Sequence, residues 1–427
     1  MPAWVDSLTV WHAAVAVLIA VPALWLWSVL GRRKHEALAR QRHRVRELAD
    51  AIAPATGAEG NRVECLLARD GSDTLRALRE GIAGARRRIS VGTYILAHDA
   101  VGRELVALLA ARAREGIEVR LLIDAIGSRT LPWFALRRLH ATGGQVAWFN
   151  PVFSLRGKGS ANWRNHRKLA VFDGTVAIIG GQNLGGQYIG SNPSRRRFRD
   201  ASFRISGPAA NHIEHIFLTD WCQATGTEPE SLRATLLEEA PPVGMERAQV
   251  IDSGPDAEGD LLWKELLRMV EGAREGIDIV TPYFIPDAEL LAALTRAARD
   301  GRRVRVIVPR RSDHRLTDFA RRPALRVLAE AGAEIYLYSP GVLHTKLVLV
   351  DRSQALIGSA NIDMRSFFLN YEIGAMVSRS PACAEIAEHI ESLAAESRQL
   401  SPRVIARAQR WHGRGLERLA KLIEPLL

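Results

Sequence analysis

Two short stretches of the chain repeat the same reactive side chains at the same spacing. Both follow the pattern H-x-K-x4-D, and in both an Asn follows at the same distance from the His. The residues are His166, Lys168, Asp173 and Asn183 in the first stretch, and His344, Lys346, Asp351 and Asn361 in the second. The chain holds 6 Lys against 52 Arg. Two such matches are therefore far more than composition predicts by chance.

The residue types of this motif suit a phosphate group. Residues two apart point to one face of a strand, so the His and the Lys project side by side if a strand starts at the His. The Asn follows a turn of small residues, where backbone can approach a ligand closely, and it offers an amide donor. Two copies facing each other would place two His, two Lys and two Asn around one phosphodiester and stabilise its charge.

A pair of imidazoles also allows two roles in one reaction. One ring can attack phosphorus while the other protonates the leaving alkoxide, which requires one neutral and one protonated ring. A single His on an apolar strand is more often a satisfied core residue, and it is the duplication that favours catalysis. Neither a metal nor a cofactor is needed to explain the set, and we expect neither.

Asp173 and Asp351 complete the motif and are grouped with the catalytic residues. A turn after a buried strand, however, commonly uses Asp to hold backbone amides. We therefore favour a structural role for both carboxylates.

The elements that must position the motifs are duplicated too. The first copy predicts a helix from Thr74, a strand over 88–94, a helix over 101–114 and a strand over 119–124; the second predicts a helix from Leu261, a strand over 277–283, a helix over 287–299 and a strand over 304–308. Each copy continues with a further helix, a Gly turn, a short strand and the His motif. This order predicts an α/β fold made of two tandem halves in a pseudo-twofold pair, each a mixed sheet flanked by helices.

The chain divides into five predicted segments. They are a membrane anchor with a basic juxtamembrane segment (1–50), the first half (61–224), a Pro-containing connector (225–247), the second half (248–400) and a basic amphipathic helix (401–427). Residues 8–30 carry no charge and can span a ~30 Å hydrocarbon core at ~1.5 Å per residue. The basic cluster after them predicts a single-pass anchor with the catalytic domain in the cytoplasm. A cleaved signal peptide is disfavoured, because its basic cluster would come first.

Composition limits the class of protein. With 47% hydrophobic and 25% charged residues, the 427-residue chain is neither disordered nor fibrous. Its net charge of +11 favours an anionic partner such as phosphate, nucleic acid or acidic lipid, without choosing among them. The three Cys form no CxxC pair, so neither a disulfide framework nor a cysteine zinc site is indicated.

From Asn61 to the C-terminus, the paired motifs resemble those of the phospholipase D superfamily. The stretches 127–129, 149–151, 164–168, 180–185 and 188–190 most resemble bacterial cardiolipin synthases. The resemblance implies two α/β halves that share one active site, a phosphohistidine intermediate and no metal. The chain differs at Gly186 and Gln187, where those enzymes usually carry an acidic pair, and this leaves the acceptor lipid open.

The resemblance also implies roles for individual residues. His166 becomes the nucleophile and His344 the general acid and base. Each His is expected to be oriented by a carboxylate from its own half, which pairs Asp200 with His166 and Glu372 with His344. The phosphate-binding residues are Lys168, Lys346, Asn183 and Asn361.

The implied activity is a phosphatidyltransferase of the bacterial inner membrane that makes cardiolipin. Phosphatidylglycerol donates the phosphatidyl group, glycerol leaves, and a second phospholipid accepts; the expected partners are phospholipids and the membrane, without nucleic acid. Water as acceptor would make the enzyme a phospholipase. A nuclease of the superfamily is disfavoured because those are often single-copy dimers without an anchor, and a non-catalytic scaffold is disfavoured because both motifs are intact.

Three basic surfaces could contact anionic lipid. The arginine clusters are Arg195, Arg196, Arg197 and Arg199, and Arg310, Arg311, His314, Arg315, Arg321 and Arg322. The first cluster is a candidate site for the phosphate of the second lipid, with a solvated loop as the alternative. We expect the helix at 401–427 to lie on an anionic membrane, with packing on the catalytic domain as the alternative.

Overall fold

The structure, a computed structural model, describes residues 59–400 apart from 152–162, 193, 195–196, 233–234, 236–238 and 256–259. The predicted anchor (1–50) and the predicted C-terminal helix (401–427) lie outside the described residues. In the part of the chain that is described, no helix combines the length and the apolar character needed to cross a bilayer.

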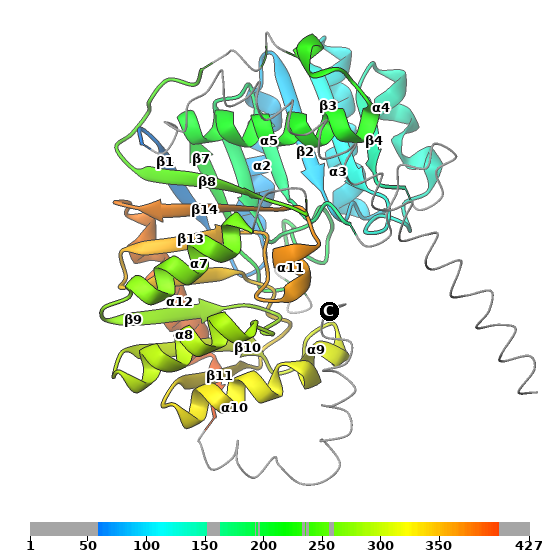
Figure 1. The fold of residues 1–427 in the computed structure, drawn as a ribbon. Helices are drawn as coiled ribbons and strands as arrows, with labels where there is room; N and C mark the ends of the chain where they lie inside the picture. The colour runs from blue at the N-terminus through cyan, green and yellow to red at the C-terminus, as the bar shows by residue number, and fades with distance from the viewer. Residues whose placement is uncertain are drawn as a thin grey trace, which may run out of the picture.

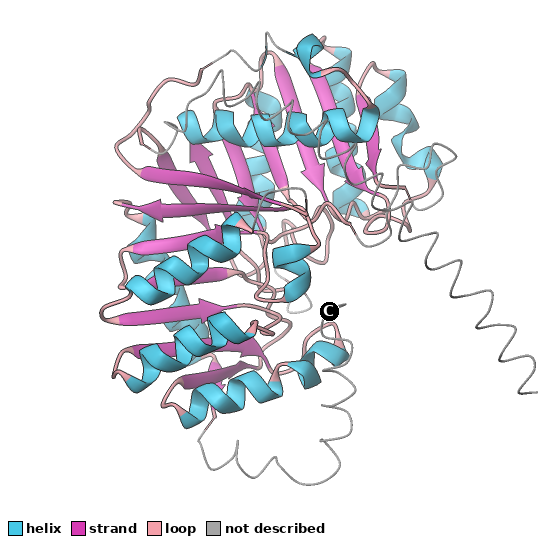
Figure 2. Ribbon diagram, viewed as in Figure 1, coloured by secondary structure: helices cyan, strands magenta, loops and turns pink. Residues whose placement is uncertain are grey.

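Within these residues, the first half is a seven-stranded mixed sheet with helices on both faces (Figures 1 and 2). Across the sheet, the strands are β1 (Arg62–Leu66), β7 (Ser202–Ser206), β6 (Val176–Gly180), β5 (Leu169–Phe172), β2 (Arg88–Thr93), β3 (Glu118–Asp124) and β4 (Gln145–Phe149). The helices are α2 (Ser72–Gly84), α3 (Ala100–Arg114), α4 (Arg137–Ala141) and α5 (Pro208–Thr225), with short 3₁₀ turns η1 (Trp133–Leu136) and η2 (Pro229–Leu232). Strands β2, β3 and β4 are parallel, and the other neighbours are antiparallel.

The second half repeats this arrangement in an eight-stranded sheet. Its strands, in order, are β15 (Ser397–Gln399), β11 (Glu334–Tyr338), β10 (Arg303–Pro309), β9 (Gly276–Val280), β12 (Leu347–Val350), β13 (Gln354–Gly358), β14 (Glu372–Ser378) and β8 (Arg247–Ser253). The helices are α7 (Leu261–Gly272), α8 (Ala288–Arg299), α9 (Arg315–Ala320), α10 (Arg322–Glu330), α11 (Met364–Phe368) and α12 (Ala382–Ala395). Strands β9, β10 and β11 are again parallel. The prediction of two α/β halves with mixed sheets is confirmed.

Local sequence explains how the helices attach to the sheets. In α7, Leu262, Leu266 and Met269 recur at helical spacing and are buried, while the Asp260 carboxylate caps the helix by accepting from the Trp263 backbone N–H at 2.8 Å. Comparable apolar stripes place α2, α3 and α4 on one face of the first sheet, and α7, α8 and α10 on one face of the second.

A third core joins the two halves. It runs from the face of the first sheet that α5 covers to the face of the second sheet that α12 covers. Phe203 and Ile213 contribute from the first half, and Ile373 and Ile386 from the second; all four are buried. The two halves therefore share one apolar core, which fixes the position of one His motif relative to the other.

One predicted boundary was wrong. The strand of each motif was expected to start at the His, but β5 begins at Leu169 and β12 begins at Leu347. The three residues before each strand do not join their own sheet, and the backbone N–H groups of His166, His344 and Thr345 bond to the opposite half.

Candidate active site

The segment that carries His166 is attached to the second half. The backbone N–H of His166 donates to the carbonyl of Tyr371 at 2.9 Å, and the N–H of Tyr371 donates to the carbonyl of Arg164 at 2.9 Å. Glu372 follows Tyr371 directly. This pairing therefore brings the Glu372 carboxylate to the His166 ring, with Nδ1 2.8 Å from Oε1 and 3.1 Å from Oε2.

The segment that carries His344 is attached to the first half in the same way. The backbone N–H groups of His344 and Thr345 donate to the carbonyl of Arg199, at 2.8 Å and 3.1 Å. Asp200 follows Arg199 directly, and its Oδ2 lies 2.6 Å from His344 Nδ1.

The two carboxylates are thus exchanged between the halves. The expectation that Asp200 orients His166 and that Glu372 orients His344 was wrong. Each His segment precedes the first residue of its strand and pairs with the backbone just before the carboxylate of the other half. The carboxylate of the opposite half is therefore the one within reach of the His. Neither half holds a complete His–carboxylate pair by itself.

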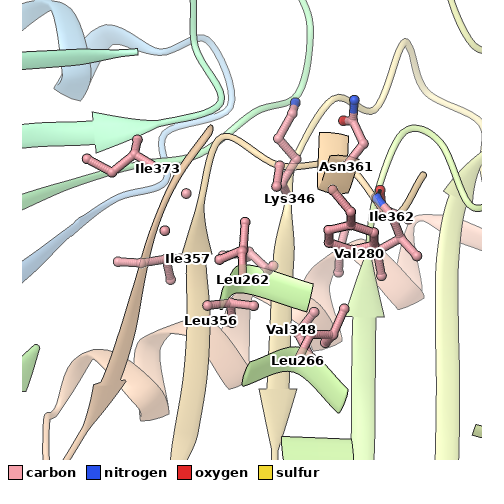
Figure 3. Close-up of a pocket in the computed structure, with 16 residues that line it drawn as sticks. Leu262, Leu266, Val280, Lys346, Val348, Leu356, Ile357, Asn361, Ile362 and Ile373 are labelled. Atoms are coloured by element: carbon pink, nitrogen blue, oxygen red, sulfur yellow. Dashed lines mark hydrogen bonds between the residues drawn. The ribbon is translucent and has the colours of Figure 1, made fainter. Parts of the chain in front are cut away.

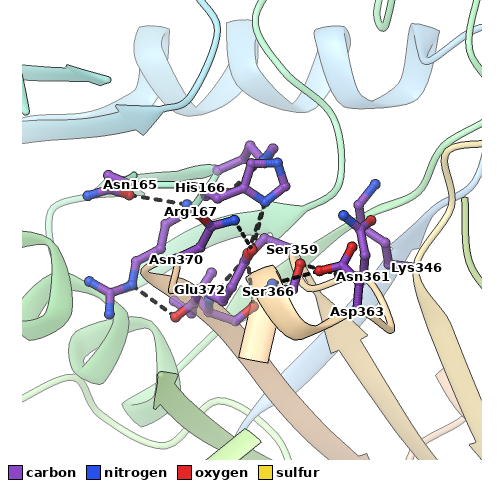
Figure 4. A network of polar contacts seen from close by, with 12 residues as sticks. Asn165, His166, Arg167, Lys346, Ser359, Asn361, Asp363, Ser366, Asn370 and Glu372 are labelled. Atoms are coloured by element: carbon purple, nitrogen blue, oxygen red, sulfur yellow. Dashed lines mark hydrogen bonds and ion pairs between the residues drawn. The ribbon is translucent and has the colours of Figure 1, made fainter. Parts of the chain in front are cut away.

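A buried polar network holds Glu372 in place (Figure 4). Besides His166, the carboxylate accepts from Ser359 Oγ and from Asn370 Nδ2, the latter at 3.3 Å. Burial would raise the pKa of Glu372, but the adjoining His166 and the nearby Lys168 outweigh it and lower the pKa to about 2. Glu372 is therefore an anion that fixes one side of the His166 ring.

His166 is the neutral partner of this anion. Burial and the nearby Lys168 lower its pKa to about 4, against the opposing effect of Glu372. A neutral ring that faces a carboxylate through Nδ1 carries its proton there, because the anion can only accept. The lone pair of His166 is then on Nε2, where it is available to attack an electrophile.

His344 differs from His166 in its surroundings. Lys346 Nζ lies 2.8 Å from His344 Nδ1 and 3.8 Å from Asp200 Oδ2, so a cation shares the space between the ring and its carboxylate. Burial and Lys346 lower the pKa of His344, and Asp200 opposes them. The residue at the position of Ser359 in the first half is Gly181, so Asp200 lacks the hydroxyl donor that Glu372 has.

Both lysines are buried and their ammonium groups face the site. Lys168 Nζ donates to the His166 carbonyl at 2.6 Å and lies 5.4 Å from the centre of the Tyr94 ring. Burial lowers the pKa of Lys168, and Lys346 lowers it further. Because the ammonium of Lys346 lowers the pKa of Lys168 from the other half, the two motifs converge on one place, where a bound phosphate would offset both charges.

The stem of Lys346 is held by apolar side chains. It borders a small cavity of about 30 Å³ that is lined in part by Leu262, Leu266 and Val348. Figure 3 shows Lys346 beside Asn361 above these apolar side chains. This packing of α7 against β12 fixes the stem while the ammonium points away from the cavity.

The two Asn residues are buried, and Asn361 lies beside Lys346. Asn183 Oδ1 accepts from the backbone N–H of Ile95 at 3.2 Å, which holds the amide oxygen in place. Asn361 Oδ1 has no hydrogen-bond partner among the described residues, and Lys346 stands beside it in Figure 4. An unpaired buried amide oxygen beside Lys346 suits a polar ligand.

Aromatic rings pack on both histidines. The Tyr94 ring lies edge to face with His166, with 5.0 Å between ring centres. Tyr188 and Phe198 contact His344 at 5.5 Å and 5.7 Å. Reasoning from the motifs missed these residues. One signal was available for Tyr94, since Tyr283 ends the equivalent strand predicted from the sequence of the second copy.

The structure does not bring Asp173 and Asp351 to the histidines. Each lies after its strand, at the end opposite the His, and adopts a positive φ, 52° and 50°. Asp173 accepts from the backbone N–H groups of Arg86, Arg87 and Arg88, and Asp351 accepts from those of Arg274, Glu275 and Gly276, at 2.8 to 3.0 Å. These contacts outweigh burial and lower the pKa of both carboxyls. The geometry is that of a turn, as the structural interpretation expects.

The first arginine cluster is not an open anion site in its described part. Arg197 Nε donates to the Gly186 carbonyl at 2.9 Å, and buried Arg199 donates to the Leu67 carbonyl at 3.2 Å. These carbonyl contacts disfavour the phosphate site at both arginines, and the burial of Arg199 disfavours the alternative of a solvated loop there. Arg195 and Arg196 lie outside the described residues.

The second cluster is split between buried and exposed members. Arg321 is buried and donates to the Pro309 carbonyl at 2.7 Å. The exposed members are Arg310, Arg311, His314, Arg315 and Arg322. Across the described residues, no group of three or more His, Cys, Asp or Glu is placed to hold a metal ion.

Comparison with known proteins gives a consistent result. The family described as "Cardiolipin synthase, PLD-like domain" matches residues 78–221 and 266–394. The chain is 36% identical over 368 residues to a cardiolipin synthase of Halalkalibacterium halodurans, covering 84% of this chain and 71% of that one. It is 37% identical over 319 residues to the major cardiolipin synthase of Bacillus subtilis, covering 75% of this chain and 66% of that one.

Two further matches extend this comparison. The chain is 36% identical over 369 residues to cardiolipin synthase A of Pseudomonas aeruginosa, covering 86% of this chain and 74% of that one. A solved structure of a phosphatidylserine synthase from Haemophilus influenzae matches with a TM-score of 0.66 at 16% identity, covering 90% of this chain and all of that one. At that identity, the structural likeness concerns the fold alone.

Proposed function

Because the chain belongs to the cardiolipin synthases of the phospholipase D superfamily, we propose that it transfers a phosphatidyl group from phosphatidylglycerol to a hydroxyl of a second phospholipid through His166. The observation that carries this proposal is the reciprocal pairing of the two histidines. His166 lies against Glu372 and His344 against Asp200, with Lys168 and Lys346 beside them.

In the first step, His166 Nε2 attacks phosphorus and the bond from phosphorus to the glycerol oxygen breaks. His344 gives its proton to that oxygen, so that glycerol leaves as a neutral alcohol. The phosphate anion bound beside His344 favours the protonated form of its ring, which burial alone disfavours. Glu372 stabilises the positive charge that His166 acquires.

In the second step, His344 takes the proton of the acceptor hydroxyl. The acceptor oxygen attacks phosphorus and the bond to His166 Nε2 breaks, which returns His166 to its neutral form and leaves His344 protonated. Lys168, Lys346, Asn183 and Asn361 stabilise charge on the non-bridging oxygens in both steps. Water in place of the second lipid would give phosphatidic acid instead.

The amino-terminal segment places this reaction at the membrane. Residues 8–30 anchor the chain in the bacterial inner membrane with a single span, and the basic residues after them keep the catalytic halves on the cytoplasmic side. Deleting residues 1–30 should move the protein to a peripheral or soluble fraction. A truncated protein that still resists carbonate extraction would contradict the anchor.

The test of the activity is a reaction of purified protein with phosphatidylglycerol in mixed micelles. Cardiolipin and glycerol should appear in equal amounts, both lost in His166→Ala. His344→Ala should slow turnover by roughly 10²- to 10⁴-fold, as expected for a lost general acid and base. Phosphatidic acid as the main product would identify a hydrolase, and turnover that survives both substitutions would end the phosphohistidine mechanism.

A second measurement assigns the two roles. With a donor whose leaving group needs no protonation, His344→Ala should still form the intermediate and accumulate it. Mass spectrometry after an acid-free quench should find a phosphatidyl adduct on His166. An adduct on His344 in the His166→Ala protein would reverse the assignment.

A further inference from the structure

Tyr283 occupies the place in the second half that Tyr94 occupies in the first, but its contacts differ. Both follow the central parallel strand of their sheet, and the chain after Tyr283 runs beside the Asn361 segment, where the N–H of Ile285 donates to the carbonyl of Ile362 at 2.7 Å. Tyr94 packs on His166. The Tyr283 hydroxyl instead donates to Asp313 Oδ1 at 2.7 Å.

Asp313 lies in the loop between β10 and α9 and is exposed. Its Oδ1 is occupied by Tyr283, which sets the direction of the carboxylate. Its Oδ2 lies 3.9 Å from His314 Nε2, which is too long for a hydrogen bond, and accepts from no other described group. Asp313 Oδ2 is therefore held in a fixed direction and can still accept a hydrogen bond from a ligand.

The tyrosine that holds this carboxylate occupies the place from which Tyr94 packs on the His of its own half, and the carboxylate acts electrostatically on the His344 side of the site. Its charge opposes the lowering of the pKa of His344 and of Lys346, and it adds to the raised pKa of Tyr188, whose ring packs on His344. Asp313 is therefore within electrostatic reach of His344, the proposed general acid and base.

The charge of Asp313 excludes one ligand and favours another. A carboxylate repels a phosphate, so Asp313 does not bind the reacting anion. It accepts strongly from hydroxyl groups, and a glycerol head group carries hydroxyls besides the one that reacts. The alcohol that leaves, or the alcohol that enters, must stand next to His344, which is within electrostatic reach of Asp313.

We propose that Asp313, held by Tyr283, binds a non-reacting hydroxyl of the glycerol group at His344 and so selects polyol head groups over simple alcohols. This inference rests on the proposed function. It adds a specificity residue that contacts the alcohol, with Tyr283 as its positioning residue.

The test is a competition between two acceptors in one reaction. Phosphatidylglycerol is the donor, and 1,3-propanediol and 1-propanol, which share a chain length and differ by one hydroxyl, are added at equal concentration. Mass spectrometry gives the ratio of phosphatidyl-propanediol to phosphatidyl-propanol. Both products come from the same intermediate, so any effect on the first step cancels in the ratio.

The wild-type ratio should favour the diol by roughly tenfold or more, as a hydrogen bond to a charged group allows. Asp313→Ala should bring the ratio close to one, and the isosteric Asp313→Asn should give an intermediate ratio. Tyr283→Phe should reduce the ratio in part, because the carboxylate loses its fixed direction. Asp300→Asn, an exposed carboxylate at the other end of β10, is the matched control and should keep the wild-type ratio.

The outcomes separate this inference from the proposed function. Wild-type transfer with a diol preference that persists in both Asp313 variants would overturn the role of Asp313 and leave the transferase standing. Phosphatidic acid as the only wild-type product would overturn the transferase itself. If Asp313 had only a structural role, its substitution would lower the melting temperature and the rates of both products together, without changing the product ratio, and would overturn the inference.

Discussion

His166 Nδ1 lies 2.8 Å from a carboxylate oxygen of Glu372, which comes 206 residues later in the chain. The mirror contact, between His344 and Asp200, joins residues 144 positions apart at 2.6 Å. The catalytic unit is thus a His from one half with a carboxylate from the other. The shared core and the backbone pairings described above hold the two parts in register.

Glu372→Gln should lower kcat by roughly 10²- to 10⁴-fold while leaving the fold intact. The amide keeps the shape of the side chain but removes the charge that fixes the His166 tautomer and stabilises its cation. Steady-state kinetics with phosphatidylglycerol, together with a melting curve, checks this. Asp200→Asn should also lower kcat, through His344. If own-half pairing were correct, Glu372→Gln would instead behave like a defect in His344 and still form the adduct on His166.

Asp173→Ala and Asp351→Ala should affect stability and spare catalysis. Each substitution leaves three backbone N–H groups without their acceptor, which should cost roughly 1–3 kcal/mol of unfolding free energy. Chemical denaturation measures this loss, and kcat at a temperature where the variants are folded should stay within about twofold of wild type. A large loss of kcat at unchanged stability would return these residues to the catalytic set.

Acidification should destabilise the protein through the His166 and Glu372 pair. The folded pKa of His166 is about 4 against 6.5 for an ordinary His, so the unfolded chain binds the extra proton first and stability falls as pH drops from 6.5 to 4. The folded pKa of Glu372 is about 2 against 4.5 for an ordinary Glu, so its protonation lowers stability further as pH drops from 4.5 to 2.

Melting temperatures between pH 7 and pH 4 check this. His166→Gln, which does not titrate, should flatten part of the slope, and His140→Gln at an exposed position should not. A slope that is equal in all three proteins would show that His166 keeps an ordinary pKa.

Activity should persist in EDTA. The positive charge that the phosphate needs is supplied by Lys168 and Lys346, and the motif has no ligand spacing typical of a metal site. Initial rates with and without chelator give the comparison. Loss of rate in EDTA that one divalent ion restores would contradict this mechanism.

Much of the fold followed from the repeat, because the helices and strands of both copies have strong apolar patterns. The partners of the histidines did not follow. The resemblance implied that Asp200 belongs with His166, yet the choice depends on how the two halves pack, and local sequence does not encode that packing. Arg199 shows the same limit, since a basic residue in a polar loop gave no sign that its guanidinium would be buried on the Leu67 carbonyl.

Because each His pairs with a carboxylate of the other half, the order of translation also determines when the active site can form. When His166 emerges from the ribosome its own partner has not been translated, and at ~5–20 residues per second Glu372 follows roughly 10–40 seconds later. The first half can fold in that interval without a competent nucleophile. A growing chain is therefore catalytically silent until nearly all of the second sheet has been made, and a chain that stops early carries His166 without the carboxylate that makes it reactive.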